Sequence, residues 1–250
     1  MSAGHDAPER STGEDEPQRP VRRGGGVIAA VRETVLVVAV ALVVSLVVKT
    51  FLLQAFYIPS QSMERTLDIG DRVVVSKLTP GPFTLHRGDV VVFADPGGWL
   101  AATPEPQRSP AGALAADVLT FVGLLPEDSD DHLIKRVVGL PGDHVVCCDP
   151  EGRVTVNDVP VDETAYLYPG AEPSLDDFDV TVPADRLWVM GDNRAESADS
   201  RYNRDKDHEG FVPLDHVVGR AYAVVWPLSH ATWLGTPGAF GAVPGRTGVG

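Results

Sequence analysis

One long apolar run near the N-terminus constrains this chain more than any other feature. From Thr34 to Phe56 the sequence contains a single charged residue, Lys49. As a helix, these 23 residues would extend about 35 Å at roughly 1.5 Å per residue, enough to cross the hydrocarbon core of a bilayer. The run is too long for the apolar part of a cleaved secretory signal, and it is apolar on every face, unlike most buried core helices. We therefore predict a membrane anchor over residues 34–56.

The basic residues around this run indicate its orientation. Four of the five arginines that precede it lie between residues 19 and 32, and after Lys49 the next basic residue is Arg65. Because basic residues favour the cytoplasmic side, we expect a cytoplasmic N-terminus and an extracytoplasmic location for everything after residue 57. The first residues are nearly free of apolar side chains, so we assign residues 1–33 to a disordered cytoplasmic tail. The four arginines near the run are Arg19, Arg22, Arg23 and Arg32.

Charge and cysteine content exclude several classes of protein. Residues 57–250 carry 29 acidic side chains against 15 basic ones, which argues against binding nucleic acid through a phosphate-neutralising face. The only cysteines, Cys147 and Cys148, are adjacent, so they cannot form a disulfide framework or a zinc site. Since adjacent side chains on a strand point apart, we expect two free structural thiols. The seven histidines show no ligand spacing, and we expect no metal or other cofactor.

Beyond the anchor the sequence pattern is typical of β structure. Short runs rich in valine alternate with turn residues such as Pro-Gly-Asp at 141–143. This punctuation predicts a mainly β, antiparallel domain over residues 57–226 rather than alternating strands and helices. The expected strands are Arg72–Ser76, Asp89–Phe93, Lys135–Val138, His144–Cys147, Arg153–Val156, Leu187–Met190 and Arg220–Trp226.

Two segments depart from the strand pattern. Residues 95–130 are rich in Pro, Gly and Ala, and we interpret them as a surface insertion with one short helix around 111–122. Residues 227–250 have Gly or Pro at nine of 24 positions, so this Gly/Pro-rich tail is too broken for a second membrane span.

Three short segments carry the candidate chemistry. Ser60-Gln61-Ser62-Met63 follows the anchor, and two serines two apart on an extended segment point to the same side. The same residues are also compatible with a simple turn after a membrane helix. Lys135 stands in the apolar strand 133–138, and a polar segment, 191–201, begins Gly-Asp-Asn. The chain has no nucleophile-elbow, phosphate-loop or zinc-protease motif.

In this order and spacing, the anchor and these segments resemble the bacterial type I signal peptidases. The likeness covers residues 59–77, 87–93, 133–143 and 191–201, and it implies a small subdomain over 144–184. In the polar segment, Ala195 and Glu196 stand where Asp-Asn is usual. The resemblance implies a Ser/Lys endopeptidase without a cofactor. The positions that it matches are Ser62 as nucleophile, Lys135 as general base, Ser60 as oxyanion donor, Ser197 as the residue that orients the lysine, and Asp199 with Arg201 as an ion pair.

The resemblance also implies partners and a location. It predicts that the chain acts on signal peptides of exported preproteins, in contact with membrane lipid and the export translocon, and does not bind nucleic acid. Because Ser62 follows the anchor so closely, the active site would lie at the outer surface of the cell membrane.

The chemistry expected of Lys135 agrees with this resemblance. No histidine is placed to activate a serine, and lysine is the remaining base. Its pKa must fall from about 10.4 to roughly 7–8 for it to act at neutral pH. The apolar neighbours Ile134 and Val137 would favour the neutral amine by desolvation, and we expect Arg136, on the opposite face, to add like-charge destabilisation.

Two other functions are compatible with parts of the pattern. One is a catalytically inactive, membrane-tethered β module that only binds peptides. The other is a self-cleaving repressor with a Ser/Lys dyad, but this class needs a DNA-binding N-terminal domain. The anchor and the acidic balance exclude the repressor.

Overall fold

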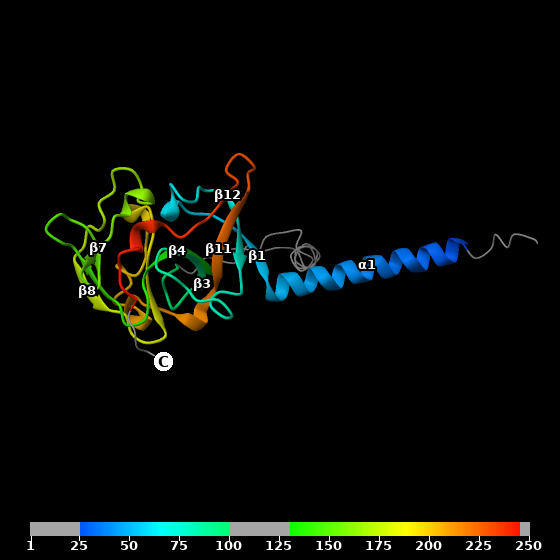
Figure 1. The fold of residues 1–250 in the computed structure, drawn as a ribbon, viewed down its shortest axis with the longest axis horizontal. Coiled ribbons are helices and arrows are strands. Elements are labelled where there is room, and N and C mark those ends of the chain that lie inside the picture. Colours follow the sequence, from blue (N-terminus) through cyan, green and yellow to red (C-terminus); the bar gives the residue numbers. More distant parts are fainter. Residues whose placement is uncertain (1–25, 101–130, 246–250) are drawn as a thin grey trace, which may run out of the picture. The chain divides into compact units, whose positions relative to one another are not determined.

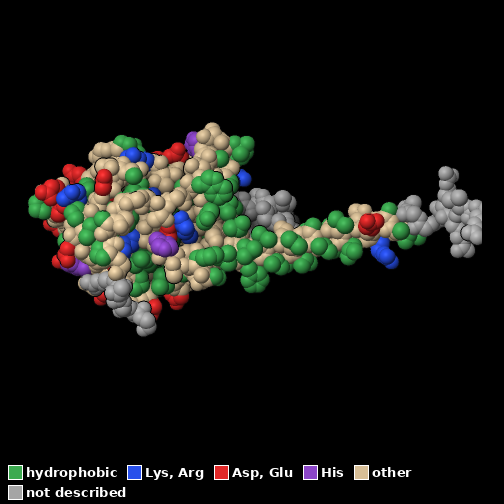
Figure 2. Space-filling view, in the orientation of Figure 1, with side chains coloured by type: hydrophobic (Ala, Val, Ile, Leu, Met, Phe, Trp, Pro, Cys, Tyr) green, Lys and Arg blue, Asp and Glu red, His purple; other side chains and the backbone are tan. Residues whose placement is uncertain are grey.

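The computed structural model describes residues 26–100 and 131–245 (Figure 1). Helix α1 spans Gly26–Phe51, and its stretch Ile28–Val48 is long and apolar enough to cross a membrane. The helix surface is hydrophobic along most of its length (Figure 2). This helix differs in extent from the predicted anchor over 34–56: residues 26–33, expected in a disordered tail, are helical, and the helix ends five residues earlier.

The segment after the helix is a strand whose side chains alternate between buried and exposed. In β1, Leu53–Tyr57, the side chains of Gln54 and Phe56 are buried whereas their neighbours are exposed. This period of two suits a strand with one covered face, and β1 pairs with β2, Arg72–Ser76. Composition alone had assigned residues 53–56 to the helix.

The larger sheet is antiparallel throughout and holds the candidate catalytic strand near its centre. Its order is β1-β2-β11-β3-β4-β9-β10, and β12 pairs with β11. The remaining strands of this sheet are β3 Val90–Ala94, β4 His132–Gly139, β9 Arg186–Met190, β10 Val212–Pro213, β11 Val217–Trp226 and β12 Thr232–Trp233.

A second, smaller antiparallel sheet has the order β7-β6-β5-β8. It lies within the predicted subdomain 144–184, and its strands are β5 His144–Cys147, β6 Thr155–Val156, β7 Val159–Pro160 and β8 Phe178–Thr181. Short 3-10 helices complete the described structure: η1 Gln61–Met63, η2 Glu163–Ala165, η3 Arg194–Glu196, η4 Asp207–Gly210, η5 Leu214–His216 and η6 Gly238–Phe240. The predicted fold class, one apolar N-terminal helix followed by antiparallel β-sheets, is confirmed.

The cysteines differ from the sequence-based prediction. Cys147 and Cys148 form a disulfide with each other rather than two free thiols. The prediction assumed that both residues lie on a strand, where adjacent side chains point apart. Strand β5 ends at Cys147, so the strand alternation does not extend to Cys148.

The predictions for the two irregular segments, 95–130 and 227–250, compare differently with the structure. The expected helix around 111–122, and most of the insertion 95–130, lie outside the described residues. At the start of that insertion, Trp99 is buried and packs edge-on against Phe93. In the Gly/Pro-rich tail, Phe240 and Val243 are buried in the core beside Tyr166, so this part of the tail belongs to the folded domain.

Candidate active site

The two candidate serines lie on a tight turn that follows β1. Ser60 is extended, and Ser62 belongs to the 3-10 helix η1 rather than to the extended segment that we expected. The side chains of Ile58 and Met63, on either side of the two serines in the sequence, are buried in the same apolar cluster and hold the turn in place. The hydroxyl oxygens of Ser60 and Ser62 lie 3.3 Å apart, so the turn still brings both to one place.

Lys135 reaches this turn from the middle of β4. The strand is paired on both sides, with β3 and β9, which fixes the position of its backbone. The Lys135 Nζ lies 2.7 Å from the Ser62 Oγ and donates to the carbonyl oxygen of Ile134 at 2.9 Å. Both Lys135 and Ser62 are only 4% exposed. The structure thus places an amine and a hydroxyl in direct contact, away from solvent.

The surroundings of Lys135 favour its neutral form. Burial is the largest influence and lowers the lysine pKa from 10.5 to about 8. The carboxylates of Asp199 and Asp192 oppose this effect, and the positive charge of Arg201 adds to it. Sequence reasoning assigned the like-charge effect to Arg136 instead. The Arg136 guanidinium is paired with Asp192, on the other side of the strand from the Lys135–Ser62 contact.

The polar segment 191–201 packs directly against the nucleophile turn. Gly191 is required there, because an added Cβ would lie 2.5 Å from the carbonyl oxygen of Ser62 and would also collide with the Ser197 side chain. Asp199 accepts a hydrogen bond from the Gly191 N–H and forms a fully buried, bidentate ion pair with Arg201. This pair fixes the end of β9 beside the candidate site.

Ser197 is brought near the site but makes no bond to the lysine. It is 3% exposed, and within the described residues its hydroxyl has no hydrogen-bond partner. The orienting role that the resemblance implies for Ser197 is therefore without a direct contact in this structure.

A second buried ion pair links the strand of the lysine to the turn of the serine. Arg136 donates to both carboxylate oxygens of Asp192, at 2.7 and 2.6 Å. The hydroxyl of Thr66 donates to the same carboxylate, and the N–H of Asn193 donates to the carbonyl of Ser62 at 3.1 Å. Sequence reasoning assigned no role to Asp192 or Thr66. The signal for Asp192 was its place in the Gly-Asp-Asn sequence directly after a buried strand.

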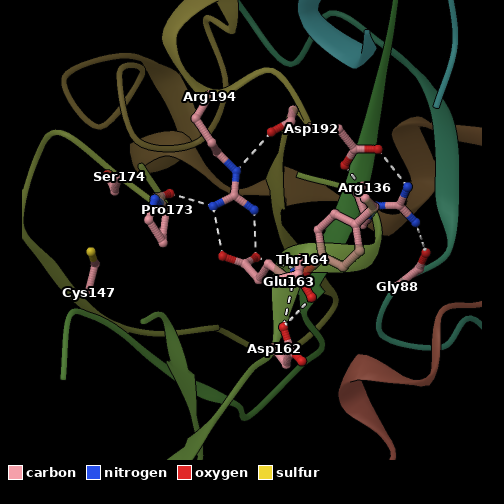
Figure 3. Close-up of polar contacts among 12 residues, drawn as sticks. Gly88, Arg136, Cys147, Asp162, Glu163, Thr164, Pro173, Ser174, Asp192 and Arg194 are labelled. Carbon is pink, nitrogen blue, oxygen red and sulfur yellow. Dashed lines mark hydrogen bonds and ion pairs between the residues drawn. The ribbon is translucent and has the colours of Figure 1, made fainter. Parts of the chain in front are cut away.

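A third buried pair anchors the loop that follows η2. Figure 3 shows the Arg194 guanidinium against the Glu163 carboxylate, with bonds of 3.0 and 2.5 Å, and bonded to the carbonyl of Pro173. Tyr166 donates its hydroxyl to Glu163 at 2.8 Å, and its ring packs under the Arg136 guanidinium. Through these contacts, loop 166–173 is joined to the Arg136–Asp192 and Arg194–Glu163 ion pairs.

Two pockets are lined by residues that contact or adjoin Ser62. The first, which we call the apolar pocket, has a volume of about 110 Å³ and is lined mainly by hydrophobic side chains, together with Ser60 and Lys135. The second, which we call the acidic pocket, has a volume of about 390 Å³, and its lining includes two acidic residues, Glu64 and Glu196. The hydrophobic lining of the apolar pocket includes Phe56, Ile58, Val92, Leu133 and Ile134. The acidic pocket is completed by Gln61, Asn193, Ala195 and residues 168–171. Among the described residues, no cluster of three or more His, Cys, Asp or Glu side chains is placed to hold a metal ion.

Comparison with known proteins gives a consistent picture. Residues 31–226 match the family model described as signal peptidase, peptidase S26. The chain is 38% identical over 235 residues to Signal peptidase I of Mycobacterium tuberculosis, covering 86% of this chain and 77% of that protein. It is 35% identical over 250 residues to a protein named Probable signal peptidase I from Mycobacterium leprae, covering 89% and 83%. Signal peptidase I of Pseudomonas fluorescens is 35% identical over 226 residues, covering 76% and 72%.

Proposed function

The chain belongs to the signal peptidase family, peptidase S26, and from this premise we propose that it is a membrane-bound serine endopeptidase that removes signal peptides with Ser62 as nucleophile and Lys135 as general base. The observation that carries this proposal is the contact of 2.7 Å between the buried Lys135 Nζ and the Ser62 Oγ. A lysine pKa of about 8 leaves an appreciable fraction of neutral amine near neutral pH.

The reaction follows from this contact. The neutral Nζ of Lys135 takes the proton of the Ser62 hydroxyl as Oγ attacks the carbonyl carbon of the scissile peptide bond. The resulting ammonium then gives that proton to the departing amine, and an acyl-enzyme remains on Ser62. Water attacks the ester, Lys135 accepts a proton from the water, and this proton returns to Oγ as the acyl group leaves.

The tetrahedral oxyanion needs hydrogen-bond donors at the serine. We assign this role to the Ser60 hydroxyl and the Ser62 N–H. The position of Ser60 beside Ser62, in the lining of the pocket that holds Lys135, supports this role for its hydroxyl. One such donor is worth roughly 3 kcal/mol in the transition state.

The apolar pocket suits the residues that precede a signal-peptide cleavage site. Such sites have a small-x-small pattern. Small side chains fit a pocket of about 110 Å³ with aliphatic and aromatic walls, and larger polar ones would lose their hydration there. We assign the signal-peptide side of the substrate to this pocket.

We also propose the orientation and partners expected from the sequence. The apolar helix α1 would anchor the protein in the cell membrane, with the arginine-containing N-terminus in the cytoplasm. The β-sheets would then be extracytoplasmic, in contact with lipid and close to the export translocon, where preproteins emerge.

A direct test is cleavage of a synthetic preprotein by the purified full-length protein in detergent. Mass spectrometry of the products should show a single cut after the small-x-small site, and Ser62→Ala should give no product. The alternative, an inactive peptide-binding module, predicts binding without cleavage in both proteins. The structure favours the peptidase because a mere binding module needs no buried lysine in contact with a serine hydroxyl.

A further inference from the structure

Ser62 has different surroundings on its two sides. Its hydroxyl contacts Ser60 and Lys135, which line the apolar pocket. Its carbonyl accepts a hydrogen bond from Asn193, which lines the acidic pocket. The apolar pocket therefore adjoins the hydroxyl of the nucleophile, and the acidic pocket adjoins its backbone carbonyl.

A peptide that is cut at Ser62 must extend in both directions from the scissile bond. If the residues before the bond occupy the apolar pocket, the residues after it leave on the side of Gln61 and Asn193, along the acidic pocket. An extended chain advances about 3.3 Å per residue, so the first few residues of the mature protein would reach this pocket.

Hydrogen bonds hold the loop at residues 168–171, which lines the acidic pocket, to the polar segment 191–201. The N–H of Tyr168 donates to the carbonyl of Asp192 at 2.9 Å, and Arg65 donates to the carbonyl of Leu167 at 2.6 Å. The pair of Arg194 with Glu163 ties the start of this loop to the same segment (Figure 3). These bonds fix the position of the loop, so the acidic pocket is a defined part of the fold.

The charges in this pocket are of one sign. Glu64 accepts one long bond, 3.3 Å from the Asn193 side chain, and keeps further acceptor capacity. Glu196 is exposed, and within the described residues its carboxylate forms no hydrogen bond or ion pair. Among the residues that line the pocket there is no lysine, arginine or histidine. Arg65 donates to the carbonyl of Leu167 and does not line the pocket.

We propose that the acidic pocket binds the first residues of the mature chain and selects a lysine or arginine there over a glutamate or aspartate. This inference rests on the proposed peptidase function. A basic side chain would form charge-assisted hydrogen bonds with Glu64 and Glu196, whereas an acidic one would meet two like charges without a neutralising partner.

The experiment uses the purified full-length protein and peptides that differ only after the scissile bond. Lysine, glutamine and glutamate are placed in turn at the first, second and third mature positions, and kcat/KM is measured for each peptide. We expect lysine to exceed glutamate by about 5- to 20-fold in at least one position, in the range of a few partly exposed charge contacts. At about 1 M salt, where the screening length is roughly 3 Å, this ratio should shrink. A ratio within about twofold at all three positions would overturn the proposal.

Variants separate the pocket from the overall negative charge of the protein. Glu196→Gln should lower the lysine-to-glutamate ratio, and Glu64→Gln combined with it should bring the ratio close to one. Asp215→Asn removes one exposed charge outside the pocket and should keep the wild-type ratio. An equal decrease in Asp215→Asn and Glu196→Gln would assign the preference to net charge and contradict the pocket. Because Glu196 is exposed, its single variant should fold even if the double variant does not.

The glutamine peptides distinguish this inference from the proposed function. Cleavage of these peptides by the wild type, together with its loss in Ser62→Ala, keeps the peptidase function even when no charge preference is found. Absence of cleavage of every peptide would instead count against the proposed function, and with it the inference.

Discussion

The Nζ of Lys135 lies 2.7 Å from the Oγ of Ser62, although the two residues are 73 positions apart in the chain. The turn after β1 supplies the serine, and the centre of β4 supplies the lysine. Burial of both side chains makes the contact chemically useful, because the lysine pKa falls only when water is excluded from its amine.

The pH dependence of cleavage should follow the protonation of Lys135. Only the neutral amine can accept the serine proton, so kcat/KM for a soluble peptide should rise with pH, with a midpoint near the Lys135 pKa of about 8. The measurement is a profile from about pH 6 to about pH 10 under conditions where chemistry limits the rate. A flat profile would mean that the base is not a lysine with this pKa.

The unfolding free energy should also depend on the protonation of Lys135. The pKa of Lys135 is lower in the folded protein than in the unfolded chain, so the unfolded state binds the proton first as pH falls from about 10.5 to about 8. Over this window the wild type should lose about 3 kcal/mol of unfolding free energy that Lys135→Met retains. Below about pH 8 the difference between the two proteins should stay constant. Denaturant unfolding at several pH values measures it, and a difference that does not change with pH would contradict burial of the amine.

Ser60 should act on the rate rather than on substrate binding. Removal of its hydroxyl in Ser60→Ala should lower kcat by about 10²- to 10³-fold, because one oxyanion donor is lost. Ser60→Thr keeps a hydroxyl and should be milder. If both variants lose the same activity with unchanged stability, the position serves packing instead.

Gly191 should tolerate no side chain. In Gly191→Ala the new Cβ would lie 2.5 Å from the backbone carbonyl of Ser62, so the nucleophile turn must move. A displacement of this kind should reduce kcat by about 10²-fold or more, since near-attack geometry is lost. Gly235→Ala is the matched control, because its Cβ meets no atom within 4 Å. Equal activity in the two variants would show that the turn adapts freely.

Most of the fold could be predicted from local sequence pattern. Arg72–Ser76 and His144–Cys147 were predicted as strands with the bounds that the structure has, because turn residues bracket each valine run. Strand β1 was missed, since its residues continue the apolar composition of the helix. Very short strands such as β7 and β12, two residues each, leave no periodic signal to detect.

The candidate site was predictable where its residues carry unusual chemistry in an apolar setting. Lys135 in a buried strand and the paired serines were visible for that reason. The contacts that position them were not, because the partners are distant in sequence: Arg136 with Asp192 and Arg194 with Glu163 are pairs that only the packed structure brings together. The disulfide between Cys147 and Cys148 was missed because it depends on where a strand ends.

The most direct test of the Ser/Lys assignment is a double-mutant comparison of single-turnover cleavage. Ser62→Ala, Lys135→Ala and the double variant are compared on one preprotein, each checked for an intact fold by circular dichroism. Since a nucleophile and its base act as one unit, we predict that each single variant loses cleavage and that the double variant is no worse than either. Appreciable turnover in Lys135→Ala, or losses that multiply in the double variant, would contradict the assignment.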